Sequence, residues 1–391
     1  MLFFVVLSIA VVLVHVYLWR RLVRDTTRPG WARRAGTAVL VVLVLLLIAA
    51  LALGTRTDPA VARWFAWPGY LWLAVFFYLL LILLVLEIPR LALRGWMRRG
   101  EETEPGGQGA ESRKLSRRDV LSRGSAALAG VVSVGLVGYG TTVALGPPSI
   151  TRFPITLRRL DPRVSGFRIA LISDIHLGPI LGRSFTQRIV DLVNAERPDA
   201  VAIVGDLVDG DVPALADATA PLADLRSTHG TFFVTGNHEY YVGYSQWVEH
   251  LPTLGITVLR NERTTINHNG GSFDLAGVND ATADQWQDAA DVDRAMRGRD
   301  PQRAAVLLAH QPVDVQDAVR NDVDLQLSGH THGGQLTPFE LAVSLQQGAV
   351  AGFYEIEGTK LYVTRGAGFW GPPVRIGAPP DITIIELRAE S

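Results

Sequence analysis

The chain of 391 residues contains no cysteine, and this excludes disulfide bonds, thiolate metal ligands and a cysteine nucleophile. Lysine is nearly absent too, because Lys114 and Lys360 are the only lysines in the sequence. The formal net charge of -1 gives the chain no general attraction for nucleic acid, so we expect no specific nucleic-acid partner. Charge-based recognition therefore has to come from local groups of residues.

Apolar residues, by contrast, make up 48% of the chain, and many of them are concentrated near its start. Three long runs with little internal charge cover about residues 2–19, 38–53 and 68–86, and a fourth run, rich in Gly and Ala, covers about 125–145. A membrane-spanning helix needs about 20 mainly apolar residues. We therefore expect three transmembrane helices within residues 1–99 and a fourth transmembrane or signal-anchor helix over residues 123–146.

Arginines flank these apolar runs unevenly. They are frequent after the first and third runs, whereas the loop between the second and third runs carries only Arg56 and Arg63. Positive charge usually marks the cytoplasmic side of a membrane protein, which places the two arginine-rich segments in the cytoplasm. The fourth run then brings the rest of the chain to the other side. We expect a multi-pass protein of the cell membrane with its C-terminal domain on the extracytoplasmic face.

Residues 100–122 are mostly polar and glycine-rich, which predicts a flexible linker. The linker carries a pair of arginines, Arg117 and Arg118, followed by a mildly apolar stretch. This pattern resembles a twin-arginine export signal. The alternative is that two arginines simply flank a membrane helix on its cytoplasmic side, and both retention and cleavage of the fourth run stay open.

From residue 151 onward, short β-rich runs alternate with helical segments, a pattern typical of an α/β domain with a partly parallel sheet. Later runs at shorter spacing, including 360–365 and 381–387, predict a second and more antiparallel sheet. Residues 147–391 therefore form the soluble domain that we expect.

Five of the predicted strands end in side chains that suit a metal ion. A lone histidine after a strand is usually structural, but five of the nine histidines stand at such ends. Ligand sites in open α/β sheets gather at the carboxyl ends of strands, so these groups predict a metal site. In chain order they are Asp174 and His176, then Asp206 and Asp209, then Asn237, His238 and Glu239, then His310, and finally His330 and His332.

The order D-x-H, G-D-x-x-D, G-N-H-E, H and G-H-x-H resembles the calcineurin-like metallophosphoesterase superfamily over about residues 165–388. With the apolar runs before it, the chain is similar to bacterial membrane-anchored members of the YkuE type. The resemblance implies an α/β fold, a two-sheet αββα sandwich preceded by an all-α transmembrane region. It also implies hydrolysis of a phosphodiester, phosphomonoester or pyrophosphate bond by attack of a metal-activated hydroxide.

The resemblance further implies how two divalent ions are held. One ion takes Asp174, His176, Asp206 and His332, and the other takes Asp206, Asn237, His310 and His330. His238 is the implied acid catalyst, and Asp209 and Glu239 orient His238 or a ligand imidazole unless they are simple turn carboxylates. Imidazole and oxygen ligands suit Mn, Fe, Zn or Co.

The substrate is less constrained than the reaction. The loops expected at the rim of the site are aromatic, with Tyr240, Tyr241, Tyr244, Trp247, Phe353, Tyr354, Phe369 and Trp370. Beside a lipid bilayer, such a rim would suit a lipid-linked phosphate ester, and ordinary packing of loop aromatics is the alternative. The other hypotheses are a UDP-diacylglucosamine-type pyrophosphatase, a non-catalytic membrane metal-binding sensor and a transporter subunit. The sequence contains no signal for the oligomeric state.

Overall fold

The computed structural model describes residues 11–92 and 117–390, and these divide into two compact units. Unit 1 comprises the described residues up to Ala50 together with those in the range Trp67–Tyr139. Unit 2 comprises Leu51–Ala66 and the described residues from Gly140 onward. The start of the first apolar run and residues 100–116 of the expected linker lie outside the described residues.

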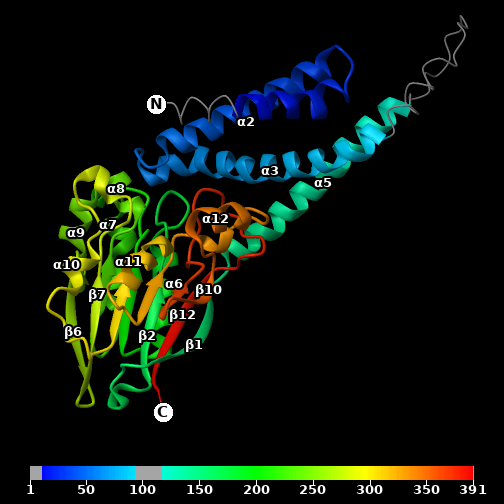
Figure 1. Ribbon diagram of the computed structural model, residues 1–391. Coiled ribbons are helices and arrows are strands. Elements are labelled where there is room, and N and C mark those ends of the chain that lie inside the picture. Colours follow the sequence, from blue (N-terminus) through cyan, green and yellow to red (C-terminus); the bar gives the residue numbers. More distant parts are fainter. Residues whose placement is uncertain (1–10, 93–116, 391) are drawn as a thin grey trace, which may run out of the picture. The chain divides into compact units, whose positions relative to one another are not determined.

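Long apolar helices precede the β-rich part of the chain (Figure 1). Residues 11–18 are helical and continue into a π-helical segment, η1 (Trp19–Arg24). Three further helices, α2 (Trp31–Leu53), α3 (Pro59–Ala92) and α5 (Arg117–Leu145), are each long and apolar enough to cross a membrane. Because α5 begins at Arg117, the paired arginines that we assigned to the linker lie in the first turn of this helix.

The last turns of α5 are part of unit 2 and pack tightly into it. Gly140 lies against the segment 374–376, where an added Cβ would be 2.5 Å from Val374 Cγ1, and its carbonyl oxygen accepts the backbone N–H of Arg375 at 2.9 Å. Ala144 is fully buried in the same hydrophobic cluster as Ala170 and Ile172. The end of α5 is therefore an integral part of this unit.

Two six-stranded sheets form the centre of the β-rich part of unit 2. In spatial order, the first sheet contains β1 (Ser149–Leu157), β12 (Asp381–Ala389), β2 (Phe167–Ile172), β3 (Ala200–Val204), β4 (Thr231–Val234) and β5 (Ile256–Val258). The second contains β10 (Gly352–Ile356), β11 (Thr359–Val363), β9 (Leu325–Ser328), β8 (Ala305–Leu308), β7 (Gly271–Gly277) and β6 (Glu262–His268).

The second sheet has two antiparallel pairs against one in the first sheet, as expected, but one of the strands predicted for it lies elsewhere. Residues 381–387 belong to β12, which pairs with β1 and β2 in the first sheet. The centre of the second sheet is parallel, since β7, β8, β9 and β11 all run in one direction and only the edge pairs β6–β7 and β10–β11 are antiparallel. Short crossover helices, α10 (Val292–Met296) and α11 (Val315–Arg320), lie in the connections from β7 to β8 and from β8 to β9, whereas the closely spaced strands β10 and β11 form an antiparallel hairpin.

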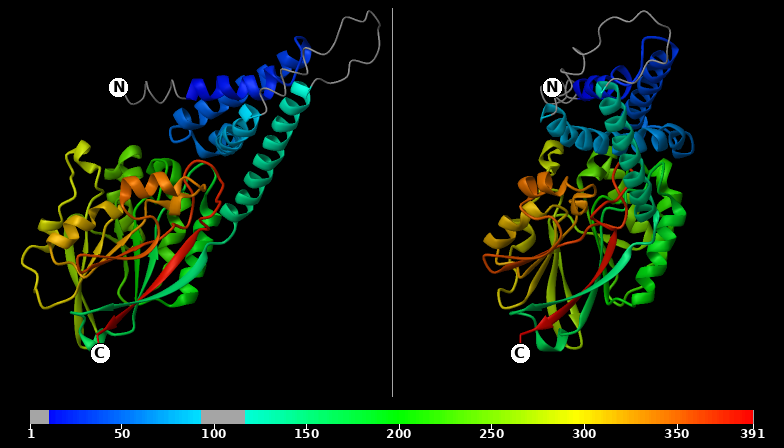
Figure 2. Two further views of the ribbon diagram at one scale, coloured as in Figure 1. Left: turned by 45° about the vertical axis from the view of Figure 1, so that its right-hand side comes forward. Right: turned by 90° about the vertical axis from the view of Figure 1, so that its right-hand side faces the viewer.

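Alternating side chains divide the domain into four layers. Ile169 and Leu171 of β2 point between the sheets, whereas Ala170 and Ile172 point outward. The outward residues pack under α6 (Arg183–Glu196), α7 (Val212–Thr219) and α9 (Tyr244–His250). Helices α10 and α11 cover the second sheet, and Figure 2 shows the green helices and the yellow and orange helices on opposite outer sides. The αββα sandwich preceded by apolar helices is confirmed.

Packing at the end of α5 predicts a difference between two nearby glycines. Gly140→Ala should lower the thermal midpoint of the full chain by several degrees, because overpacking a close contact costs about 1–3 kcal/mol. Gly138→Ala is the matched control, since an added Cβ there meets no atom within 4 Å. Intrinsic tryptophan fluorescence during heating measures both variants. Equal midpoints for the two would contradict the close packing of Gly140.

Candidate metal centre

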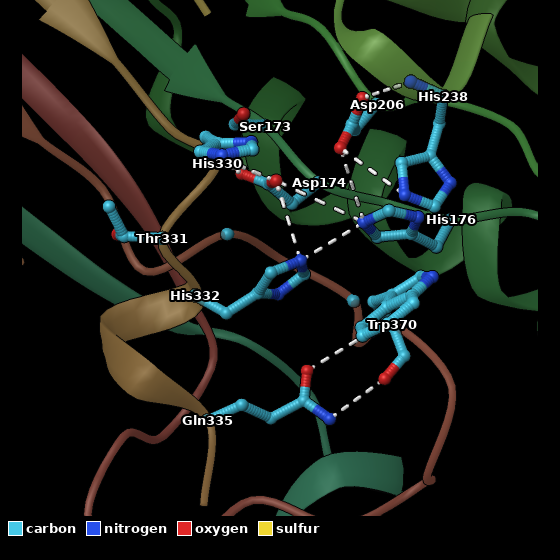
Figure 3. A network of polar contacts seen from close by, with 12 residues as sticks. Ser173, Asp174, His176, Asp206, His238, His330, Thr331, His332, Gln335 and Trp370 are labelled. Carbon is cyan, nitrogen blue, oxygen red and sulfur yellow. Dashed lines mark hydrogen bonds and ion pairs between the residues drawn. The ribbon is translucent and has the colours of Figure 1, made fainter. Parts of the chain in front are cut away.

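The candidate ligands come from five strands whose carboxyl ends meet at one edge of the sandwich. Asp174 and His176 follow β2, Asp206 follows β3, and Asn237 follows β4 as the first residue of α8 (Asn237–Val242). On the other sheet, His310 follows β8, and His330 and His332 follow β9. The structure brings six of these seven into clusters that could hold a metal ion, and Figure 3 shows several of them converging.

One cluster is formed by Asp174, His176 and His332, which are all buried. The two Nε2 atoms of His176 and His332 are 3.0 Å apart, and His332 Nε2 is 3.5 Å from Asp174 Oδ1 (Figure 3). Asp206 Oδ2 is 3.7 Å from His176 Nε2. Four potential ligand atoms therefore face a common point.

A second cluster is formed by Asp206, His310 and His330. His310 Nε2 is 3.2 Å from Asp206 Oδ2 and 3.2 Å from His330 Nδ1. Asp206 Oδ2 thus lies within reach of both clusters, as expected of a bridging carboxylate. The buried Oδ1 of Asn237 has no hydrogen-bond partner in the described part of the chain, although buried amide oxygens are normally satisfied.

These groups suit a dinuclear metal site. Imidazole nitrogens in close contact, two buried carboxylates and an unpartnered amide oxygen are all suitable ligands for divalent cations. Metal ligation needs neutral imidazoles. Burial lowers the pKa of His330 to about 3, and burial together with Arg375 holds the pKa of His332 well below its usual value, so both histidines are neutral at physiological pH.

His238 lies beside the clusters and is linked to both through carboxylates. Its Nδ1 is 2.6 Å from Asp209 Oδ1, and the same oxygen is 3.0 Å from Nδ1 of His176. Its Nε2 is 4.0 Å from Asp206 Oδ2. Burial alone would lower the pKa of His238, but Asp206 and Asp209 outweigh burial and raise this pKa to about 9. Asp209 therefore orients the two imidazoles and favours the imidazolium form of His238.

The contacts of Glu239 agree with the alternative of a turn carboxylate. Its carboxylate contacts no imidazole and instead accepts backbone N–H groups from Asp206 (3.0 Å), Leu207 (2.7 Å) and Gly236 (2.7 Å). It therefore holds the loop after β3 against the loop after β4. Burial raises the pKa of Glu239 to about 8, with Asp206 adding to the rise.

The backbone around the ligands is unusual as well. Asp174, His176, Asp206, His330 and His332 all have φ between 50° and 70°, in the left-handed region that L-residues rarely adopt. An added Cβ at Gly329 would lie 1.9 Å from Ser173 Oγ, so the loop after β9 can approach β2 only with glycine there. Such strained positions often cluster at functional sites.

A family model described as calcineurin-like phosphoesterase matches residues 167–334. Over 260 residues the chain is 42% identical to a metallophosphoesterase of Helicobacter pylori, which corresponds to 65% of this chain and 68% of that protein. The chain belongs to the calcineurin-like metallophosphoesterase family. Since these proteins are phosphoric ester hydrolases, the chain is an enzyme of that class.

Two further relatives of this metallophosphoesterase extend the comparison. A protein of Bos taurus named as a transmembrane protein with metallophosphoesterase domain is 39% identical over 292 residues, 71% of this chain and 64% of its own length. YkuE of Bacillus subtilis, also named as a metallophosphoesterase, is 29% identical over 287 residues, 71% of this chain and 99% of its own length. Together with the apolar helices, the bovine name suggests a membrane protein.

Arg375 is a residue of the metallophosphoesterase site that sequence reasoning missed. Its fully buried guanidinium donates to the carbonyl oxygens of His332 (2.9 Å) and Gly368 (2.9 Å), and it lies 3.1 Å from His332 Nδ1. Burial lowers its pKa to about 10, which leaves it positively charged at neutral pH. Arg375 thus ties the loop after β11 to the back of a candidate ligand. The only signal in the sequence was an arginine at the end of the aromatic segment 366–375.

The aromatic rim is smaller than expected. Trp247, Phe369 and Tyr240 are buried, so ordinary packing explains them. Tyr241 and Trp370 are exposed, and their rings lie 5.4 Å and 6.1 Å from the ring of His238. Two aromatic side chains therefore flank the site at His238.

The position of Arg375 predicts that Arg375→Lys weakens metal binding about 10- to 100-fold, because lysine cannot reproduce the planar set of contacts that supports His332. Titration of the metal-free full chain with Mn²⁺ measures this change. Arg365→Lys is the control, since Arg365 lies in the same loop but is partly exposed and pairs with Asp381. Unchanged affinity in Arg375→Lys would show that this contact does not support the ligand.

Proposed function

We propose that the protein is a membrane-anchored, dinuclear metallophosphoesterase that acts on a lipid-linked phosphate ester at the extracytoplasmic face of the membrane. The observation that carries the catalytic part is Asp206, whose Oδ2 lies 3.7 Å from His176 Nε2, 3.2 Å from His310 Nε2 and 4.0 Å from His238 Nε2. One carboxylate thereby connects both ligand clusters to the candidate acid. The orientation rests on the distribution of arginine before residue 119, and the paired arginines support export by a twin-arginine route.

In this proposal the ions are held as the spacing of the ligands suggests. One lies among Asp174, His176, Asp206 and His332, and the other among Asp206, Asn237, His310 and His330. When bound, two such ions activate water and neutralise the charge of a phosphoryl group. Mn, Fe, Zn and Co all suit this set of imidazole and oxygen ligands. The protein's own part is to orient these ligands and to supply a proton.

His238 is the group that supplies the proton. Because Asp209 accepts the proton on Nδ1, the second proton of the imidazolium is on Nε2, the nitrogen that faces Asp206 and the clusters. A pKa of about 9 keeps His238 charged at neutral pH, so Nε2 can donate a proton to the leaving oxygen. The backbone N–H of His238 also donates to Asp206 Oδ1 at 2.9 Å, which fixes the acid relative to the shared carboxylate.

Turnover with two kinds of ester tests this function. The full chain in detergent with Mn²⁺ should hydrolyse both p-nitrophenyl and alkyl phosphate esters, and Asp206→Asn should abolish both activities. His238→Ala should slow release of the alkyl alcohol by about 100- to 10,000-fold and affect the nitrophenyl ester much less, because nitrophenolate leaves without a proton.

The matched control for these variants is Asp217→Asn, which changes an exposed carboxylate on α7 and should leave turnover unaltered. Metal-independent turnover, or equal loss of both esters in His238→Ala, would contradict the assigned roles. The phosphate released is measured directly, so that both esters are compared by the same product.

The contact between Asp209 and His238 predicts a change in pH dependence. The imidazolium is the active form, so turnover of the alkyl ester should fall as pH rises through the raised pKa of His238, which is about 9. Asp209→Asn removes one of the two carboxylates that raise this pKa, and the fall should therefore begin at lower pH. The rate measured from neutral to alkaline pH checks the direction. A fall displaced to higher pH, or not displaced, would remove Asp209 from this role.

A further inference from the structure

The exposed large apolar side chains of the catalytic domain are unevenly distributed. Among the described residues after Leu145 they are Tyr241, Val313, Phe339, Leu341, Leu345, Phe353 and Trp370. Three of these seven lie on or just before α12 (Glu340–Gln347), and two flank His238. The apolar surface of this domain is therefore concentrated beside its site.

Helix α12 directs its large aliphatic side chains outward. Leu341 and Leu345 are four residues apart and so share a face, with 66% and 89% of their surfaces exposed. Gln347 is the only buried residue of the helix. A surface helix of a globular protein normally turns its apolar face to the core. The segment 339–347 also carries a single charge, Glu340, so its outer face is apolar and nearly neutral.

The exposed apolar face of α12 and the end of α5 lie at the same edge of the sandwich, as the directions of the strands show. Strand β1 begins at Ser149, four residues after α5 ends, and it runs parallel to β12, which is antiparallel to β2. The start of β1 therefore lies at the carboxyl end of β2, the edge that carries Asp174 and His176. Contacts agree with this topology, because the N–H of Arg375 donates to Gly140 and the N–H of Thr337, just before α12, donates to Ile376.

Trp370 connects α12 to the reaction site. Its N–H donates to Gln335 Oε1 at 3.1 Å, and Gln335 Nε2 donates to the carbonyl oxygen of Trp370 at 3.0 Å (Figure 3). Gln335 stands between His332 and α12 in the chain. These hydrogen bonds tie the backbone of Trp370 to the segment that leads into α12, and its half-exposed indole lies 6.1 Å from the ring of His238.

We propose that α12 and Phe339, together with Trp370 and Tyr241, form a membrane-contact surface that holds the site open toward the lipid bilayer. The inference rests on the proposed function, and it specifies that the phosphate is taken from a lipid at the bilayer surface. Leucine and aromatic side chains are those that enter a membrane interface. A lipid surface fits better than a protein partner because α5, a candidate span, joins the domain at this same edge.

Because the chain has no cysteine, single labelling positions can be introduced without background. Leu345→Cys and Arg158→Cys in the full chain are each labelled with a polarity-sensitive fluorophore and reconstituted into phosphatidylcholine–phosphatidylglycerol vesicles. Arg158 is the control, since it is exposed and follows β1 at the opposite edge of the sandwich. The label at 345 should be quenched by nitroxides on lipid acyl chains and protected from aqueous iodide. The label at 158 should be quenched by iodide and not by the lipid nitroxides.

Two results would overturn the membrane contact. Equal quenching by iodide at both positions would place α12 in water. Protection at 345 from iodide and from lipid nitroxides alike would mean that protein covers the helix, either another part of this chain or a second copy.

Comparing the turnover of a lipid substrate with that of a soluble ester distinguishes the membrane contact from the proposed phosphoesterase activity. Leu345→Glu should lower kcat/KM for a phosphate ester of a vesicle lipid at least tenfold and leave that for a soluble alkyl phosphate unchanged. Gln346→Glu adds the same charge at a neighbouring exposed position and should change neither. Equal effects of the two substitutions on the lipid substrate would contradict the inference. If the unaltered chain hydrolysed no soluble ester, the proposed function would fail, and the quenching measurement would still decide whether α12 contacts lipid.

Discussion

The shared carboxylate of Asp206 is the group on which the arrangement of the site depends. Its Oδ1 accepts the N–H of His238, and its Oδ2 lies within 4.0 Å of three imidazoles, so one side chain relates the acid to both ligand clusters. A second buried carboxylate, Asp174, has its pKa raised by burial. Buried carboxylates without compensating charge are costly, which makes bound cations part of the stability of this region as well as of its chemistry.

The candidate ligands were predictable from the sequence because they follow directly after the mainly apolar runs that form the strands. The runs of β3 and β8 are apolar throughout, whereas β2, β4 and β9 include the polar residues Arg168, Thr231, Gln326 and Ser328. Each of the five is followed within a few residues by its candidate ligands. Strand β1 gave no such signal, since it carries Pro154 and alternates in exposure as an edge strand can. The parallel centre of the second sheet was missed because short helices make its crossovers. Local patterns therefore identified residues that the fold brings together more reliably than they predicted the pairing of the strands.

The roles of Glu239 and Arg375 depended on geometry that no local pattern contains. Asn237, His238 and Glu239 are consecutive in the first turn of α8, where successive side chains diverge by about 100°. Three neighbours there cannot face one point, and Glu239 turns instead to the backbone of the loop after β3. Arg375 is far from His332 in sequence, and only the folding of the loop after β11 brings its charge behind that imidazole.

The topology of the first sheet places the candidate metal ligands at the same edge of the sandwich as the end of α5. Had β1 been antiparallel to β12, the chain would enter the sandwich at the edge opposite the ligands, and the site would face away from the end of α5. The parallel pairing of β1 with β12 instead brings that end to the ligand edge. In the proposed membrane-anchored protein, a span in α5 would keep the site near the bilayer, because Ala144 is already inside the core and Gly140 is packed against segment 374–376. It is this arrangement that the proposal of a substrate confined to the membrane surface rests on.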